Sequence, residues 1–311
     1  MRGSATVSAG PNSTGDADRT GSQHGSGAAR GRPAQKRTVA KRAADGERIA
    51  GRGGRPQHNR RDETRVQGNG RPPAQRRGDG PQDGEPARLE LPADADASEL
   101  DRDVRQELLT LPKGLADLVG KHLVMVARLL DEDPQLALAH ARFARSKAGR
   151  VAAVREVAGL AAYHAGEWSE ALAELRAARR LGADTGRLAV LADCERALGR
   201  PERALEIARS PEARQLGTEE SVELRIVAAG ARRDLGQFDA AVLALQGPDL
   251  KTPGEEPWRA RLRYAYADNL LAAGREQDAI RWFLAAAEVD VEEATDAAER
   301  AVELSERPAP E

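Results

Sequence analysis

The segment His164-Ala165-Gly166-Glu167-Trp168-Ser169-Glu170-Ala171-Leu172 carries a pattern that occurs four times in this chain of 311 residues. The other copies lie at residues 197–205, 234–242 and 272–280. In every copy an alanine follows the glycine by five positions, and a Leu, Val or Ile comes directly after that alanine. Successive glycines are 33, 37 and 38 residues apart. Self-similarity at this interval is the signature of a structural repeat.

Each position of the pattern has a physical role in a turn between two helices. The glycine would end one helix in the left-handed backbone conformation, which costs little for a residue without Cβ. The alanine would let the two helices approach closely, and the aliphatic residue after it would face the core. The predicted turn and packing residues are Gly166, Ala171, Gly199, Ala204, Gly236, Ala241, Gly274 and Ala279. We therefore expect four helix–turn–helix corners.

The sequence around these corners is typical of helices. From residue 98 onward it is rich in Ala, Leu, Glu and Arg, which have high helix propensity. Apolar residues recur at helical spacing over residues 115–130, and further helices are expected at 134–147 and 292–305. No alternating run of β-branched residues bounded by turns interrupts them, so no sheet is expected. We predict an all-α domain over residues 98–311.

Residues 150–290 resemble the tetratricopeptide-repeat family, whose helix–turn–helix units of about 34 residues carry the same Gly…Ala-Leu signature. The resemblance implies a right-handed α-solenoid of antiparallel helix pairs, with capping helices on both sides. The longer glycine spacings imply insertions at residues 210–218 and 247–257. Two polar residues, Glu195 and Arg232, stand where the first helix of a family member is usually apolar.

The resemblance also implies a partner-binding face, lined by the first helix of each pair. Counting back from the glycines places Tyr163, Arg196, Arg233 and Tyr264 on the outward side of these helices. Tyrosine supplies a large contact area at low cost in rotamer freedom and is a frequent hot-spot residue. Packing in the core is the alternative interpretation for both tyrosines.

Residues 1–97 have a different composition from the rest of the chain. They contain 16 of the 30 glycines and 8 of the 17 prolines, whereas all nine aromatic residues lie beyond residue 142. Such a segment cannot bury enough apolar surface to offset a backbone entropy of about 1–2 kcal/mol per residue. We expect a long disordered arm and linker ahead of the repeat domain.

Charge divides the chain at the same place. Residues 1–97 hold 18 Lys or Arg against 12 Asp or Glu, a net of +6, and the remaining residues have a net of −8. A basic arm on an acidic body is typical of polyanion binding, but no aromatic residue is present for base stacking. A solubilising tail is the alternative. The candidate polyanion-binding residues are Arg52, Arg55, Arg60, Arg61, Arg71, Arg76 and Arg77.

Several classes of site are excluded by the residues themselves. The single cysteine, Cys194, allows neither an intramolecular disulfide nor a cysteine-based zinc cluster. The histidines show no metal-binding spacing, and His122 is expected to pack in the core. Motifs for a nucleophile turn, a phosphate loop or a dinucleotide site are missing. The pairs Glu219-Glu220 and Glu292-Glu293 are expected at helix starts, where acidic residues favour the helix dipole.

These observations lead to an expected function. The chain has no apolar run long enough to span a membrane and no apolar segment near Met1, so we expect a cytoplasmic protein. No cofactor, metal or catalytic residue is predicted. The leading hypothesis is a non-enzymatic scaffold or adaptor that binds a protein or peptide partner through the repeats. The alternatives are an RNA- or ribosome-associated protein that acts through the arm, and an enzyme of unrecognised class.

Overall fold

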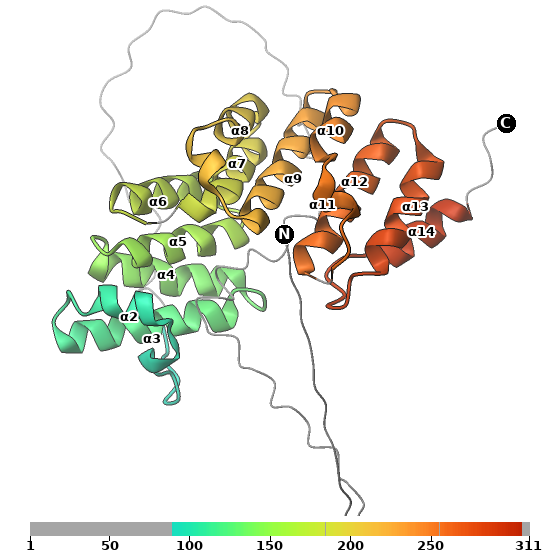
Figure 1. The fold of residues 1–311 in the computed structure, drawn as a ribbon. Coiled ribbons are helices and arrows are strands. Elements are labelled where there is room, and N and C mark those ends of the chain that lie inside the picture. The colour runs from blue at the N-terminus through green and yellow to red at the C-terminus, as the bar shows by residue number, and fades with distance from the viewer. Residues whose placement is uncertain (1–88, 184, 255, 307–311) are drawn as a thin grey trace, which may run out of the picture. The chain divides into compact units, whose positions relative to one another are not determined.

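The computed structural model describes residues 89–183, 185–254 and 256–306, and these residues are all-helical, with no strand among them (Figure 1). The α-helices are α2 (Arg102–Leu108), α3 (Lys113–Leu129), α4 (Pro134–Ala148), α5 (Ala152–His164), α6 (Trp168–Arg180), α7 (Leu188–Ala197), α8 (Pro201–Ala208), α9 (Thr218–Asp234), α10 (Phe238–Leu245), α11 (Pro248–Lys251), α12 (Pro257–Ala272), α13 (Glu276–Ala287) and α14 (Ala297–Ser305). Three short 3₁₀ helices are η1 (Ala97–Glu99), η2 (Thr185–Arg187) and η3 (Glu212–Gln215). The prediction of an all-α body is confirmed for this part of the chain.

Several helices begin where the sequence supplies a start signal. Proline occupies the first position of α4, α8, α11 and α12, where its missing N–H leaves no hydrogen bond unmade. The Asp133 carboxylate caps α4 by accepting a 3.0 Å hydrogen bond from the amide of Leu136. Glu219 and Glu220 lie in the first turn of α9, as predicted.

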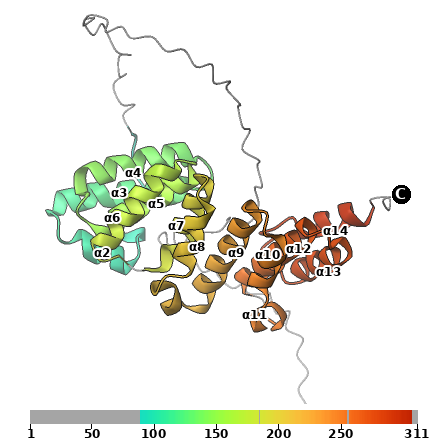
Figure 2. The ribbon, with the colours of Figure 1, turned by 90° about the horizontal axis from the view of Figure 1, so that it is seen from above.

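Helices that follow one another in the chain pack side by side (Figures 1 and 2). The pairs are α3 with α4, α5 with α6, α7 with α8, α9 with α10, and α12 with α13. The second helix of each pair also contacts the first helix of the next, and α14 packs on α13. We call α5, α7, α9 and α12, which begin the four pairs that contain a glycine corner, together with α14, the first helices. Among them, α7 contacts α9 and α9 contacts α12 directly.

The four corners of the sequence pattern share one backbone geometry. Gly166, Gly199, Gly236 and Gly274 have φ of 79°, 73°, 71° and 75°, the left-handed conformation that the pattern predicts. At the first corner the Gly166 amide donates to the Tyr163 carbonyl at 3.0 Å, and the next amide donates to the Ala162 carbonyl at 2.8 Å. The same two bonds close the other three corners. In each case the second helix begins two residues after the glycine.

The small residue of each corner lies in the tightest part of the packing. Ala171, Ala204, Ala241 and Ala279 are all 0% exposed. They belong to two clusters of buried apolar side chains, one spanning α3 to α9 and the other spanning α9 to α14. A Cβ on Gly159 of α5 would lie 2.6 Å from Leu175 of α6, so these two helices meet at a glycine as well. These contacts join helices that follow one another in the chain, so each helix pair contributes its own section of the core.

The structure corrects two of the predicted boundaries. The last helix begins at Ala297 and not at residue 292, because Glu293 has a positive φ of 51° and the Asp290 carboxylate binds the amides of Ala294 and Thr295 in a turn. Glu292 and Glu293 therefore precede the helix. At the other end, Ala95 is 3% exposed, so packing starts before the predicted linker ends at residue 97.

The predicted insertions contain short helices, η3 and α11. The prediction of a disordered arm, with its candidate arginines from Arg52 to Arg77, lies outside the described residues and stays a prediction.

Candidate interaction face

The first helices are linked by side-chain contacts near their C-terminal ends. The hydroxyl of Tyr163 on α5 donates a 2.6 Å hydrogen bond to Asp193 Oδ2 on α7. Tyr163 lies three residues before its turn glycine, and Asp193 lies six residues before the next one. Burial raises the pKa of Tyr163 well above its usual value, and the nearby Asp193 carboxylate raises it further. The phenol is therefore a fixed hydrogen-bond donor.

The next contact in the series is made by Arg196 on α7. Its guanidinium binds Asp193 Oδ1 at 2.7 Å and Asp234 Oδ2 at 2.6 Å, so it joins α7 to α9. Gly230 of α9 lies six residues before its turn glycine, the position that Asp193 occupies in α7. A Cβ on Gly230 would lie 3.1 Å from the Arg196 guanidinium carbon. Burial would lower the pKa of Arg196, but Asp193 and Asp234 outweigh it and raise the pKa above its usual value. Arg196 thus lies over a glycine of the neighbouring helix.

The third contact joins α9 to α12 and continues to α14. Arg233 forms an ion pair with Asp268, again from three residues before one turn glycine to six residues before the next. Asp268 also pairs with Arg300 of α14 at 3.5 Å. We call Tyr163, Asp193, Arg196, Asp234, Arg233, Asp268 and Arg300 the inter-helix line. Its charged side chains are 15–37% exposed, so each is held by a partner and still reaches solvent.

The structure brings three of the four predicted face residues into this line and places the fourth in the core. Tyr163, Arg196 and Arg233 each contact the next first helix. Tyr264 is 6% exposed and packs edge-on against Phe283, with ring centroids 5.2 Å apart. The geometry favours core packing, one of the two interpretations of Tyr264.

Sequence reasoning did not find that the aspartates of this face bind the arginines. The signal was present in the sequence. At two interfaces a hydrogen-bond donor, Tyr163 or Arg233, stands three residues before one turn glycine, and an aspartate stands six residues before the next turn glycine.

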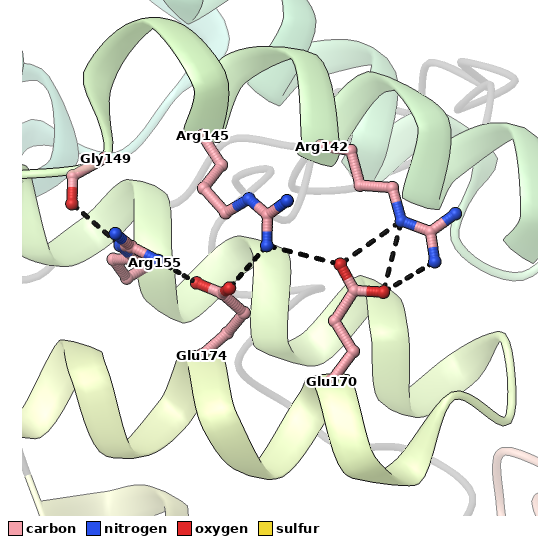
Figure 3. A network of polar contacts seen from close by, with 6 residues as sticks. All are labelled: Arg142, Arg145, Gly149, Arg155, Glu170 and Glu174. Atoms are coloured by element: carbon pink, nitrogen blue, oxygen red, sulfur yellow. Dashed lines mark hydrogen bonds and ion pairs between the residues drawn. The ribbon is translucent and has the colours of Figure 1, made fainter. Parts of the chain in front are cut away.

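A second network joins α4, α5 and α6 (Figure 3). Glu174 of α6 is 5% exposed, and its two oxygens bind Arg145 of α4 at 2.6 Å and Arg155 of α5 at 2.7 Å. Glu170, one turn earlier, binds Arg142 through both carboxylate oxygens, and the hydrogen bond from Arg142 lowers the pKa of Glu170. The network therefore places two carboxylates between three guanidinium groups. Each buried oxygen has a donor, which is the condition for burying an ion pair without a large penalty.

Buried carboxylates recur at the later interfaces. Glu195 of α7 is 1% exposed and pairs with Arg176 of α6 at 2.6 Å and Arg200 at 3.3 Å. This ion pairing explains why a charged residue stands where the family resemblance implies an apolar one. Glu223 of α9 pairs with Arg261 of α12 at 2.7 Å, yet burial raises the pKa of Glu223. Its second oxygen, Oε2, is buried without a hydrogen-bond partner.

Two buried histidines form a contact between α3 and α4. The Nδ1 atoms of His122 and His140 are 2.9 Å apart, and the rings are 3% and 1% exposed. The pKa of His122 falls to about 4, chiefly through burial and then through its neighbour, and burial also lowers the pKa of His140. Both rings are neutral at pH 7, so one Nδ1–H donates to the other Nδ1. The expected core position of His122 is confirmed.

The remaining candidate groups are packed inside the protein. Cys194 is buried, and burial raises the pKa of its thiol to about 12, so it is protonated at neutral pH. Among the described residues, no group of three or more His, Cys, Asp or Glu side chains is arranged to hold a metal ion. Within the same residues, no helix combines the length and the apolarity that crossing a bilayer needs.

No protein-family model matches this chain, and no curated protein shows significant similarity to it.

Proposed function

We propose that the chain is a non-enzymatic scaffold, a divergent tetratricopeptide-type α-solenoid that binds a protein segment along its first helices. The observation that carries this proposal is the inter-helix line. It repeats one relation, from three residues before a turn glycine to six residues before the next, at the α5–α7 and α9–α12 interfaces. Between them Arg196 joins α7 to α9 through Asp234. A series of units that contact only their neighbours forms an extended surface, which suits a partner in an elongated conformation.

The chemistry of the line supports a peptide partner. Acidic and basic groups alternate along it, and their side chains are fixed by the ion pairs described above. A fixed array of donors and acceptors loses little side-chain entropy on binding, so it can recognise polar groups at low cost. We therefore propose a polar protein segment as the partner.

Affinity purification from a lysate, with two sets of variants, tests the proposal. Asp234→Asn and Arg300→Gln change the charge pattern at two half-exposed positions of the line. Arg281→Gln is the matched control, because Arg281 is 73% exposed and lies outside the line. We expect a stoichiometric protein partner with the wild type and the control, and at least a fivefold lower yield with the double variant. Equal capture by all three proteins, or no partner under mild conditions, would contradict the proposal.

A second candidate function rests on the charge of residues 1–77, where 17 Lys or Arg face 6 Asp or Glu. In this alternative the arm binds RNA or ribosome-associated machinery by phosphate attraction. Nuclease treatment during the purification separates the two candidates. A partner that disappears with nuclease belongs to the arm, and one that persists belongs to the repeats.

A further inference from the structure

A pocket of about 200 Å³ opens between α8, η3, α9 and α10. Its floor is one stripe of α9, formed by residues at helical spacing: Ser221, Leu224, Arg225, Ala228 and Arg232. The pocket lies apart from the inter-helix line, since it shares no residue with it.

The pocket exists because the helices beside α9 are short. α8 and α10 each have 8 residues, whereas α9 has 17 and the corresponding second helices α6 and α13 have 13 and 12. α8 ends at Ala208 and α10 ends at Leu245, so part of the α9 surface between them stays uncovered. Alanines from η3 and α10 form part of the walls. A side chain larger than alanine at Ala244 would reach into this space.

The lining of the pocket is basic. It includes Arg209, Arg225 and Arg232, and no acidic residue is among the side chains that line it. Arg225 is neutralised by Asp249, 2.8 Å from its Nη2 atom. Arg209 is exposed at the rim and makes no ion pair with a described residue. Two of the three positive charges are therefore not compensated within the described part of the protein.

Arg232 is the exceptional arginine of the described segment. It is half-buried, its Nε is closed to solvent, and its side chain makes no ion pair or hydrogen bond with a described residue. Every other buried or half-buried arginine in residues 89–306 that the structure describes has an acidic or carbonyl partner. Arg225 Nε, on the same floor, is also buried without an acceptor. Burying such donors unpaired is unfavourable. The remaining guanidinium nitrogens of Arg232 have no described partner either, and they would bind an oxyanion in the pocket.

We propose that this pocket binds a carboxylate on a short apolar stem, with Arg232 as its main ligand. The guanidinium fork fits the two oxygens of a carboxylate, and the Ser221 hydroxyl offers a further donor. Leu205, Leu224 and the alanines supply an apolar wall for the stem, and the small volume limits it to a few carbon atoms. Arg209 adds attraction at the entrance. A free short-chain acid and an Asp or Glu side chain of a peptide share this chemistry.

The experiment is a titration of the full chain followed by amide chemical shifts. The probes are butyrate, its neutral analogue butyramide, inorganic phosphate, and the peptide acetyl-Ala-Glu-Ala-amide with its Gln counterpart. We expect saturable binding of butyrate with a dissociation constant on the order of 1 mM. The shifts should concentrate at residues 221–232, and butyramide and the Gln peptide should bind at least tenfold more weakly.

Three variants locate the site. Arg232→Gln keeps a polar side chain without the charge and should weaken butyrate binding at least tenfold. Ala244→Leu fills the pocket without removing a charge and should have the same effect, so the test remains decisive if Arg232→Gln misfolds. Arg180→Gln is the control, because Arg180 is exposed on α6 and does not line the pocket, and it should bind butyrate like the wild type.

Each outcome supports or overturns the proposal. A Glu peptide that binds at least as tightly as butyrate identifies a peptide as the source of the carboxylate, and a peptide that is excluded identifies a free acid. Three results would overturn the proposal: absence of butyrate binding, binding by Arg232→Gln and Ala244→Leu that equals that of the wild type, or tighter binding of phosphate than of butyrate. Because the probes are small acids, these results do not depend on capture of the scaffold partner.

Discussion

Tyr163 and Asp193 lie 30 positions apart in the chain, and a 2.6 Å hydrogen bond joins the hydroxyl of one to the carboxylate of the other. The same step, from three residues before one turn glycine to six before the next, joins Arg233 to Asp268. At these two interfaces the same positions of the repeat bring side chains of neighbouring helix pairs into contact.

Removal of the Tyr163 hydroxyl should loosen the contact between α5 and α7. A hydrogen bond to a charged group contributes about 1.5–3 kcal/mol, so we expect Tyr163→Phe to lower the free energy of unfolding by about 1.5 kcal/mol. Tyr266→Phe is the matched control, because the Tyr266 hydroxyl accepts a neutral bond from Gln246 at 3.1 Å. Its expected effect is about 0.5 kcal/mol. Urea unfolding measures both, and equal losses would contradict the assigned role of Asp193.

Gly199 and Gly114 provide a test of the turn geometry. A Cβ at either position would meet nothing within 4 Å, but only Gly199 has a positive φ, of 73°. Gly199→Ala should therefore destabilise the protein by about 1 kcal/mol through backbone strain alone. Gly114→Ala, in the first turn of α3, should stabilise it by about 0.5 kcal/mol. Thermal unfolding gives the two signs, and a stabilising Gly199→Ala would be inconsistent with a left-handed corner.

Glu174 should be the most sensitive member of the network between α4, α5 and α6. Glu174→Gln leaves Arg155 without a carboxylate partner and leaves Arg145 with only its 3.4 Å contact to Glu170, and we expect a loss of about 2–3 kcal/mol in unfolding free energy. The control is Arg281→Ala, which breaks an exposed ion pair with Asp278 and should cost less than about 1 kcal/mol. A loss for Glu174→Gln as small as that of the control would show that the buried pairing contributes little.

The His122–His140 contact predicts that stability falls in mild acid. The pKa of His122 drops from an ordinary 6.5 to about 4 on folding, so the unfolded chain binds the proton more readily. The stabilising contribution is complete above pH 6.5 and is lost as the pH falls from 6.5 toward 4. For His122 the expected loss is about 3 kcal/mol.

Two variants separate titration of the histidines from packing. Replacing both histidines by Leu should remove this pH dependence, whereas Phe143→Leu should lower stability equally at every pH. Phe143 stacks on His122 at 4.1 Å but carries no titratable group. Urea unfolding between pH 4 and pH 8 measures both variants. A double variant that retains the acid sensitivity of the wild type would assign it to other groups.

Deletion of residues 1–88 should abolish polyanion binding if the arm is a nucleic-acid element. Because the attraction is to phosphates, binding of the full chain to a mixed RNA should weaken steeply between 50 and about 200 mM salt. Fluorescence anisotropy on the two chains measures this. Equal binding by the truncated chain would assign the polyanion site to the helical body instead.

The corners were predictable from sequence because they depend on local chemistry. A glycine in the left-handed conformation and an alanine at the closest approach are required by the backbone itself, so Gly166 and Ala171 identify a corner without knowledge of its neighbours. The start of α14 was not predictable in the same way. The helical pattern extends back to Glu292, but the Asp290 carboxylate binds two amides and holds the chain in a turn.

The partners of the polar residues inside the helical body could not be predicted from the sequence. Glu195 and Arg232 are both polar residues at positions where a first helix is usually apolar. The sequence alone does not distinguish the surroundings of the two side chains. In the structure Glu195 is enclosed by Arg176 and Arg200, whereas Arg232 lines a pocket with no acidic residue beside it. The pocket at Arg232 opens because α8 and α10 are short, so the environment of Arg232 depends on two helices other than its own.

Gly230 makes two distant positions interdependent. Its missing side chain leaves the room that the Arg196 guanidinium occupies, so the backbone of one helix limits the size of a side chain on another. Gly230→Ala should be tolerated far better when Arg196 is shortened to Ala than when it is kept, a non-additivity between positions in contact. Engineering of this protein by recombining single repeats must therefore exchange the two residues together.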